Sequence, residues 1–355
     1  MSRNKFSKIS SIIKDAKRGR MFILVDDKNR ENEGDLVIPG SKCNSKSINF
    51  MAKHGRGLIC LALTKKQIDN LKLPLMSPNN KSRMQTAFTI SIEAKKGITT
   101  GISAQDRART IKTAINAKAK KADIVSPGHV FPLVARNGGV LERAGHTEAS
   151  VDISKLSNLN PSSVICEVMN EDGRMARLND LYKFSKKHKI KLASIEDIIS
   201  YRLKYEKLII KLGSKIFYSN NKIKNYIHYY KNILDNNINF VITRGSLNQK
   251  KSIVVRVIST KVYNKNILSN IKVKRSFKIL SKFKNYLLLV INNGNNSYKI
   301  NNINTLRYYG IGAQIIKDLN VKNMILLSRS RKKIIGLDGF GLKIKKQIII
   351  KWKKF

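Results

Sequence analysis

The sequence predicts an α/β protein with two domains: an α+β layered domain over residues 1–205 and a second α/β domain over residues 206–355. Three observations predict this fold class. Strand-like apolar runs are mixed with helical patterns along the chain. The apolar content of 42% is enough for two buried cores in 355 residues. Acidic residues are scarce after residue 206, where three Asp and Glu stand against 32 Lys and Arg.

The elements of the first domain follow from apolar periodicity and from helix-capping residues. Apolar residues at helical spacing before Gly19 predict a helix over residues 7–18, and the next apolar run predicts a strand at residues 21–25. Ser103 with Asp106, and Ser194 with Asp197, are capping pairs that open helices, the first of which reaches about residue 121. The remaining predicted strands lie at residues 58–63, 88–92 and 164–169.

The second domain has a similar mixture of patterns. Apolar runs predict strands at residues 240–242, 253–258, 286–291 and 324–327, and a helical pattern covers residues 311–319. The Asn-rich stretch 292–304 is predicted to be a loop. Since no linker rich in Pro, Gly or Ser separates the halves, the boundary near residue 205 rests on the fall in acidic residues.

Five of the 23 acidic residues lie directly after the first predicted strand: Asp26, Asp27, Glu31, Glu33 and Asp35. Carboxylates this close repel one another unless a cation lies among them. In an extended segment Glu31, Glu33 and Asp35 share one face, and Gly34 lets the backbone turn. The segment therefore indicates a cation site, and a solvated acidic loop is the alternative.

Three further side chains are candidates for chemistry. His129 and His146 stand in segments rich in Gly and Pro, which expose a side chain on a rigid backbone. His146 is predicted to open a helix just after Arg143, and a helix N-terminus beside a guanidinium suits a phosphate. Glu167 ends an apolar segment, where desolvation raises the proton affinity of a carboxylate for acid/base work. Structural histidines, an ordinary helix cap and a solvated glutamate are the alternatives.

Composition argues against several protein classes. Cys43, Cys60 and Cys166 are odd in number and far apart, which argues against disulfide frameworks and Cys-based zinc sites. No apolar stretch suits a signal peptide or a membrane span, so we expect a cytoplasmic protein with no membrane partner. The formal net charge is +47, but the lysines are scattered and no recognition motif accompanies them, so we expect no specific nucleic-acid partner.

Several long motifs follow one another in order through residues 1 to about 205: Asp26-Asp27, Arg30-Glu31-Asn32-Glu33-Gly34-Asp35, Thr99-Thr100-Gly101-Ile102-Ser103-Ala104, Arg107, Pro127-Gly128-His129-Val130-Phe131-Pro132-Leu133, Gly138-Gly139-Val140-Leu141 and Gly145-His146-Thr147-Glu148-Ala149. Together they closely resemble the 3,4-dihydroxy-2-butanone 4-phosphate synthase family of riboflavin biosynthesis. Residues 82–86 depart from the Tyr-Gly-Thr type segment of that family.

The resemblance implies conversion of D-ribulose 5-phosphate to 3,4-dihydroxy-2-butanone 4-phosphate and formate by a homodimeric lyase that uses Mg²⁺ or Mn²⁺. It implies that Glu31 and His146 are the metal ligands and that His129 and Glu167 are the catalytic acid/base pair. The residues that it implies for substrate binding are Arg30, Glu31, Asp35, Arg143, Ala144, Gly145, His146 and Thr147.

Two patches of the second half, residues 307–315 and 334–342, resemble GTP cyclohydrolase II. The active family binds zinc through three cysteines, but no cysteine follows Cys166 in this chain. The family's Arg-Gln-Glu-Gly-Arg-Gly-like and Thr-Asn-Asn-Pro-Lys-like segments are also replaced. We therefore expect an inactive domain with a structural or dimerising role. The alternatives for the whole chain are a bifunctional enzyme that also hydrolyses GTP and a basic nucleic-acid-binding protein.

Overall fold

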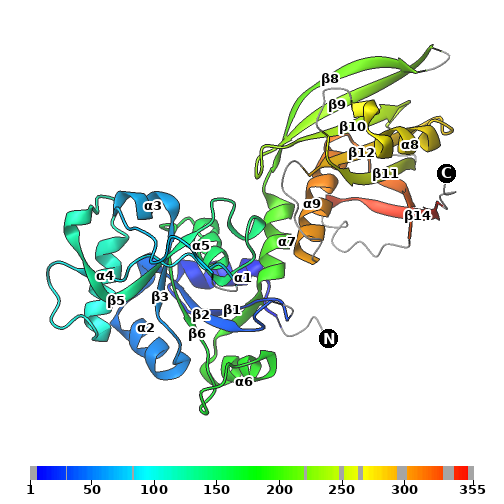
Figure 1. The fold of residues 1–355 in the computed structure, drawn as a ribbon. Coiled ribbons are helices and arrows are strands. Elements are labelled where there is room, and N and C mark those ends of the chain that lie inside the picture. The colour runs from blue at the N-terminus through cyan, green and yellow to red at the C-terminus, as the bar shows by residue number, and fades with distance from the viewer. Residues whose placement is uncertain are drawn as a thin grey trace. The chain divides into compact units, whose positions relative to one another are not determined.

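The computed structural model describes residues 6–28, 30–81, 84–219, 222–247, 252–262, 267–293, 302–330 and 340–350, and the side chains of residues 302–309 are not described. The chain divides into two compact units, Met1–Ile199 and Ser200–Phe355 (Figure 1). The division falls inside one helix, α7 (Ile195–Tyr205), which also contains the boundary expected from the sequence.

Unit 1 mixes helices and strands along the chain. Its helices are α1 (Ile9–Lys17), α2 (Ser45–Phe50), α3 (Lys65–Asn70), α4 (Ala104–Ala114), α5 (His146–Leu156), α6 (Leu178–His188) and the first part of α7. Its strands are β1 (Phe22–Val25), β2 (Gly34–Pro39), β3 (Cys60–Thr64), β4 (Ile92–Ala94), β5 (Ile124–Ala135), β6 (Ser163–Glu167) and β7 (Lys191–Ser194).

The strands of unit 1 form one mixed sheet in the order β4-β5-β3-β6-β2-β1-β7. Side chains of successive strand residues point to opposite faces. Ile23, Leu36 and Val164 belong to the main apolar core, which also receives residues of α2, α4 and α6. The other face is covered by α5, which contacts β1, β2, β3, β5 and β6. The alternation therefore turns Asp35, next to Leu36, toward the α5 face.

Most of the predicted elements of unit 1 are confirmed, with shifted ends. The first helix and strand are α1 and β1, and Gly19 after α1 has the left-handed φ of 70°. Ser103 caps α4 as predicted, but the helix ends at Ala114 and not near residue 121. The expected strand at residues 88–92 is shorter and later, at β4. His129, expected in a loop, lies within the long strand β5.

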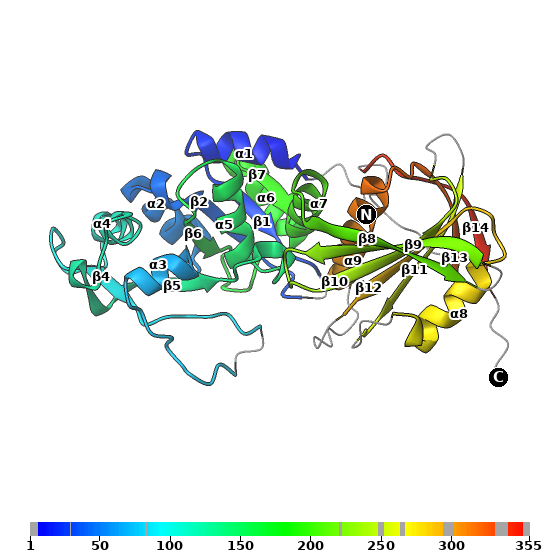
Figure 2. The same cartoon turned by 90° about the horizontal axis from the view of Figure 1, so that it is seen from above.

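Unit 2 is a second mixed sheet, ordered β14-β13-β11-β12-β10-β9-β8. Figure 2 shows α8 and α9 on opposite faces of it; α8 contributes Val273 and Leu280 to the core that contains Leu288, whereas Gly312 of α9 faces Leu289. The elements are β8 (Ile209–Ser219), β9 (Ile223–Asn232), β10 (Ile238–Arg244), β11 (Ile253–Thr260), α8 (Ile271–Leu280), β12 (Tyr286–Asn292), α9 (Asn302–Asp318), β13 (Asn323–Ser328) and β14 (Lys343–Ile349).

The predicted strands of unit 2 correspond to β10, β11, β12 and β13, and the predicted helix is part of α9. The strands β8, β9 and β14 and the helix α8 were not predicted. Most of the expected Asn-rich loop, residues 294–301, lies outside the described residues. In the described part of the chain, no helix has the length and apolar character needed to cross a bilayer.

Candidate active site

The acidic segment is the turn between β1 and β2, which pair as an antiparallel hairpin. The turn depends on Asn32, whose φ of 57° is left-handed, and not on Gly34, which belongs to β2. The prediction that Gly34 turns the backbone is therefore wrong. Gly34 is needed instead for close packing, because a Cβ there would lie 2.5 Å from Leu181 of α6.

Two of the side chains that were expected on one face meet at the same ring. Glu31 and Asp35 both face His146, with 3.7 Å between the nearest carboxylate oxygen of each and Nδ1 of the ring. Glu33 lies 3.8 Å from Arg177, and its charge also helps to raise the pKa of Asp35. The left-handed residue Asn32 interrupts the extended alternation between Glu31 and Glu33.

His146 is the first residue of α5, as its sequence context predicted. Gly145 is the N-cap, and no side chain caps this end of the helix, so the dipole and the first N–H groups face the site. A side chain at residue 145 would have to displace Arg143, because its Cβ would lie 2.3 Å from Nη1 of that residue. The helix start thus places His146 beneath the acidic turn.

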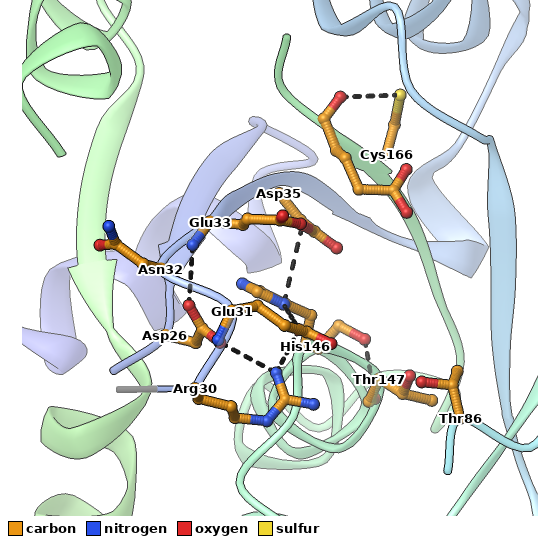
Figure 3. A network of polar contacts seen from close by, with 12 residues as sticks. Asp26, Arg30, Glu31, Asn32, Glu33, Asp35, Thr86, His146, Thr147 and Cys166 are labelled. Carbon is orange, nitrogen blue, oxygen red and sulfur yellow. Dashed lines mark hydrogen bonds and ion pairs between the residues drawn. The ribbon is translucent and has the colours of Figure 1, made fainter. Parts of the chain in front are cut away.

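The hairpin and the helix start converge on the His146 ring (Figure 3). Arg30 pairs with Asp26 at 2.9 Å and with Glu31. Two buried atoms of the cluster, Oδ1 of Asp35 and Nε2 of His146, have no hydrogen-bond partner. Buried polar atoms without partners are costly in a finished structure, so their presence points to a missing polar ligand.

The electrostatics of the cluster favour added positive charge. Burial raises the pKa of Asp35, and the neighbouring carboxylates of Glu167 and Glu31 raise it further, although His146 opposes them. Burial lowers the pKa of His146, but Asp35 and Glu31 outweigh burial and raise it. Burial likewise raises the pKa of Glu31, yet His146 and Arg30 lower it to about 2. The same negative field that favours a proton on the imidazole favours a cation.

The donor set fits a divalent ion. Asp26, Glu31 and His146 offer ligand atoms that all lie within 4.8 Å of one another, and they are the only such group among the described residues. Ligand atoms that share one ion at about 2.1 Å lie no more than about 4.2 Å apart, and the 3.7 Å between Glu31 and His146 satisfies this limit. Asp26 is less available, because its oxygens accept bonds from Glu31 N, Glu33 N and Arg30.

Arg143 precedes α5 as predicted, but its guanidinium is occupied by protein groups. Nη1 donates to Glu148 at 2.7 Å, and Nη2 donates to the carbonyl of Met84 at 3.0 Å and to Oγ1 of Thr86 at 2.9 Å. Ala144, Gly145 and Thr147 lie beside it along the start of α5, and Thr147 is buried. A substrate group that binds Arg143 must therefore share or replace these partners.

Glu167 ends β6 as predicted and pairs in register with Asp35 of β2, on the same face of the sheet. Its carboxylate accepts a hydrogen bond from Leu58 N at 2.8 Å. His129 is half-exposed and pairs with Glu93. Because β3 separates β5 from β6, roughly 10 Å lies between the backbones of His129 and Glu167, and no described contact joins the two side chains.

Sequence reasoning missed two residues that shape the site, Glu93 and Arg177, and the role of a third, Asp26. Asp26 was counted in the acidic cluster, but its bonds to the backbone of the turn follow from the left-handed turn and from no pattern in the sequence. Glu93 and Arg177 contact His129 and the turn from distant parts of the chain. Part of the segment that departs from the family pattern, residues 82–83, lies outside the described residues.

Both halves of the chain match known protein families. Residues 10–201 match the sequence family described as 3,4-dihydroxy-2-butanone 4-phosphate synthase, and residues 220–349 match GTP cyclohydrolase II. The riboflavin biosynthesis protein RibBA of Aquifex aeolicus is 42% identical in an alignment that covers 98% of this chain and 93% of the relative.

Two solved structures extend the comparison to the fold. RibBX, a two-domain 3,4-dihydroxy-2-butanone 4-phosphate synthase from A. baumannii, is 36% identical with a TM-score of 0.82, over 97% of this chain and 100% of that one. A 3,4-dihydroxy-2-butanone 4-phosphate synthase in complex with two magnesium ions is 37% identical with a TM-score of 0.54, over 57% of this chain and 99% of that one.

Proposed function

Because this chain belongs to the 3,4-dihydroxy-2-butanone 4-phosphate synthase family, we propose that the cluster around His146 is where its reaction takes place. The chain is a lyase of riboflavin biosynthesis that depends on a divalent metal and converts D-ribulose 5-phosphate to 3,4-dihydroxy-2-butanone 4-phosphate and formate. The observation that carries the assignment of the site is the pair of buried, unpartnered atoms on Asp35 and His146.

Glu31 and His146 hold the cation in this proposal, and the ion is Mg²⁺ or Mn²⁺. A carboxylate oxygen and a neutral imidazole suit both ions. When bound, the cation stabilises negative charge that develops on substrate oxygens. Asp26 holds Glu31 in place, because it accepts the N–H of Glu31 at 3.0 Å and also pairs with Arg30.

The sugar phosphate lies along the start of α5, with its phosphate near Arg143, Ala144, Gly145 and Thr147. Support comes from the uncapped N-terminus of α5, whose N–H groups and dipole favour an anion. Arg30 and Asp35 contact the sugar portion, together with Glu31 and His146. Arg143 exchanges contacts with Met84 and Thr86 for contacts with the phosphate, so substrate binding is coupled to the segment around Thr86.

His129 and Glu167 transfer protons in the reaction, which requires repeated proton movements during enolisation, loss of water and release of formate. Support comes from its pairing with Asp35 on the face of the sheet that α5 covers. His129 lies two strands away from Glu167 in one chain.

We further propose a cytoplasmic homodimer without a specific nucleic-acid partner, and light scattering of the purified chain measures the dimer directly.

The assignment of the metal ligands is tested by formate release from ribulose 5-phosphate in the presence of Mg²⁺, with EDTA as the metal-free condition. Loss of groups that only support a ligand costs 10- to 100-fold, so Glu31→Ala and His146→Ala should each lower the rate by more than about 100-fold. His54→Ala removes an imidazole outside the cluster and is the matched control. Retained activity in Glu31→Ala or His146→Ala contradicts the assignment.

The C-terminal domain is catalytically inactive toward GTP in this proposal. It matches GTP cyclohydrolase II over residues 220–349, but it lacks the three zinc-binding cysteines. A structural or dimerising role remains for a domain that keeps a complete sheet and core.

A further inference from the structure

The acidic turn has few backbone hydrogen bonds of its own. Asp26 N donates to Glu33 O at 3.2 Å, and Arg30 N donates to Asp27 O at 2.8 Å. From the inner side, the Asp26 carboxylate accepts the N–H groups of Glu31 and Glu33 at 3.0 and 2.9 Å. The conformation of the turn therefore depends on side chains that bind its backbone.

Arg177 binds the same backbone from the other side. Its Nη1 donates to the carbonyl of Glu31 at 2.8 Å and to the carbonyl of Asn32 at 2.7 Å. Glu31 is thus held at both of its backbone polar groups, at N–H by Asp26 and at C=O by Arg177. Asn32 is the left-handed residue of the turn, so Arg177 contacts the point where the backbone reverses.

The position of Arg177 is itself fixed by α6. It is the N-cap residue, and its N–H donates to Asp180 at 3.0 Å. Leu181, one turn into the helix, is fully buried and packs against Gly34 just past the turn. The helix therefore brings Arg177 to the turn on a rigid support, from a position 146 residues later in the sequence than Glu31.

We propose that Arg177 is a positioning residue for the reaction: it holds the backbone of Glu31 so that the Glu31 carboxylate and the His146 ring can share one cation. This inference rests on the proposed role of Glu31 and His146 as metal ligands. Arg177 acts through Glu31 and not on the substrate. The side chain of Arg177 is 48% exposed, so water can replace its hydrogen bonds to the turn, and its loss should change metal binding more than unfolding.

The test uses the full chain and Mn²⁺ as the probe, with affinity measured by electron paramagnetic resonance. Arg177→Met should weaken Mn²⁺ binding by about 10- to 100-fold, the usual effect of losing a group that supports a ligand. At saturating Mn²⁺ its kcat should return to within a few-fold of the unaltered chain, and its melting temperature should stay close to the unaltered value. Arg177→Lys keeps the positive charge and one donor nitrogen, so it should recover part of the affinity.

Arg174→Met is the matched control, because Arg174 lies three residues earlier, is exposed and pairs with Asp172. The proposal is overturned if Arg177→Met binds Mn²⁺ as tightly as the unaltered chain, if Arg174→Met weakens binding equally, or if the loss disappears once the unfolded fraction is subtracted. Glu31→Ala separates this failure from failure of the ligand assignment: if Glu31→Ala binds Mn²⁺ normally, the ligand assignment is wrong whatever Arg177 does.

Discussion

At the scale of single residues, two glycines let the backbone come close to charged side chains of the proposed site. Gly145 leaves room for Arg143 at the start of α5. Gly101 does the same for Glu93, the partner of His129: with a φ of 88°, it lies where a Cβ would come 1.7 Å from Oε1 of Glu93. The backbone angle favours glycine at residue 101, and a side chain there would have to displace the Glu93 carboxylate.

Gly101→Ala should destabilise unit 1 by about 1–3 kcal/mol, because it adds displacement of the Glu93 carboxylate to the backbone strain. Gly173→Ala is the matched control: its φ is 81°, but no atom lies within 4 Å of the new Cβ, so only the backbone term of about 1 kcal/mol applies. Urea denaturation of the full chain measures both. Equal losses in the two variants would show that the contact with Glu93 is unimportant.

Residue types and motifs predicted much of the site, while its geometry came from tertiary structure. Glu31, Asp35 and His146 were expected together and do meet. The course of the turn between Glu31 and Glu33 was not predictable, because it depends on a left-handed φ at Asn32 that several residue types can adopt. Arg177 was not predictable either, because α6 brings it to the turn from a distant part of the chain.

At the scale of elements, prediction succeeded where strands are buried and failed where they are exposed. The strands β10, β11 and β12 are mostly buried and read as apolar runs. β8 is an edge strand with nearly every side chain exposed, so Lys, Gly and Ser interrupt any alternation in its sequence. Neighbouring strands, not its own pattern, specify β8.

The same part of the sheet contains a histidine whose protonation should weaken unit 2. His228 on β9 has Ser214 Oγ at 2.6 Å from Nδ1 and Thr243 Oγ1 at 2.9 Å from Nε2. Burial, followed by the charge of Lys211, lowers its pKa from 6.5 to about 4. Since the unfolded chain binds the proton more readily, the stability contribution is complete above about pH 6.5 and is lost as the pH falls toward 4.

After discounting for partial exposure, the loss should be about 1–2 kcal/mol. Hydrogen exchange of β9 amides, followed by mass spectrometry between pH 7 and pH 4.5 and corrected for intrinsic rates, measures it. His228→Gln removes the titrating group, so its protection should change less with pH, whereas His54→Gln in unit 1 should leave the change in β9 intact. An unchanged pH dependence in His228→Gln would assign the effect to other groups.

At the scale of the whole molecule, the two units differ in what chemistry their residues allow. In the described residues, the acidic and imidazole groups that can surround an ion lie in unit 1. Unit 2 has the match to GTP cyclohydrolase II without cysteines to bind zinc. RibBX, which resembles this chain over both units, is likewise a synthase with two domains.

The purified chain should therefore contain no stoichiometric zinc by mass spectrometry of metals and should release no formate from GTP, with or without added Zn²⁺. The same preparation should release formate from ribulose 5-phosphate with Mg²⁺, which shows that it is folded and active. An active GTP cyclohydrolase II assayed in parallel is the positive control. Zinc-dependent formate release from GTP would establish the bifunctional alternative.

The pairing of Asp35 with Glu167 across β2 and β6 limits how this sequence can change. A single inserted or deleted residue in either strand would turn one carboxylate from the α5 face into the apolar core and move an aliphatic side chain among the charges. Insertions and deletions in related sequences should therefore occur in surface loops. The lengths of β2 and β6 should stay constant even where individual residues are substituted.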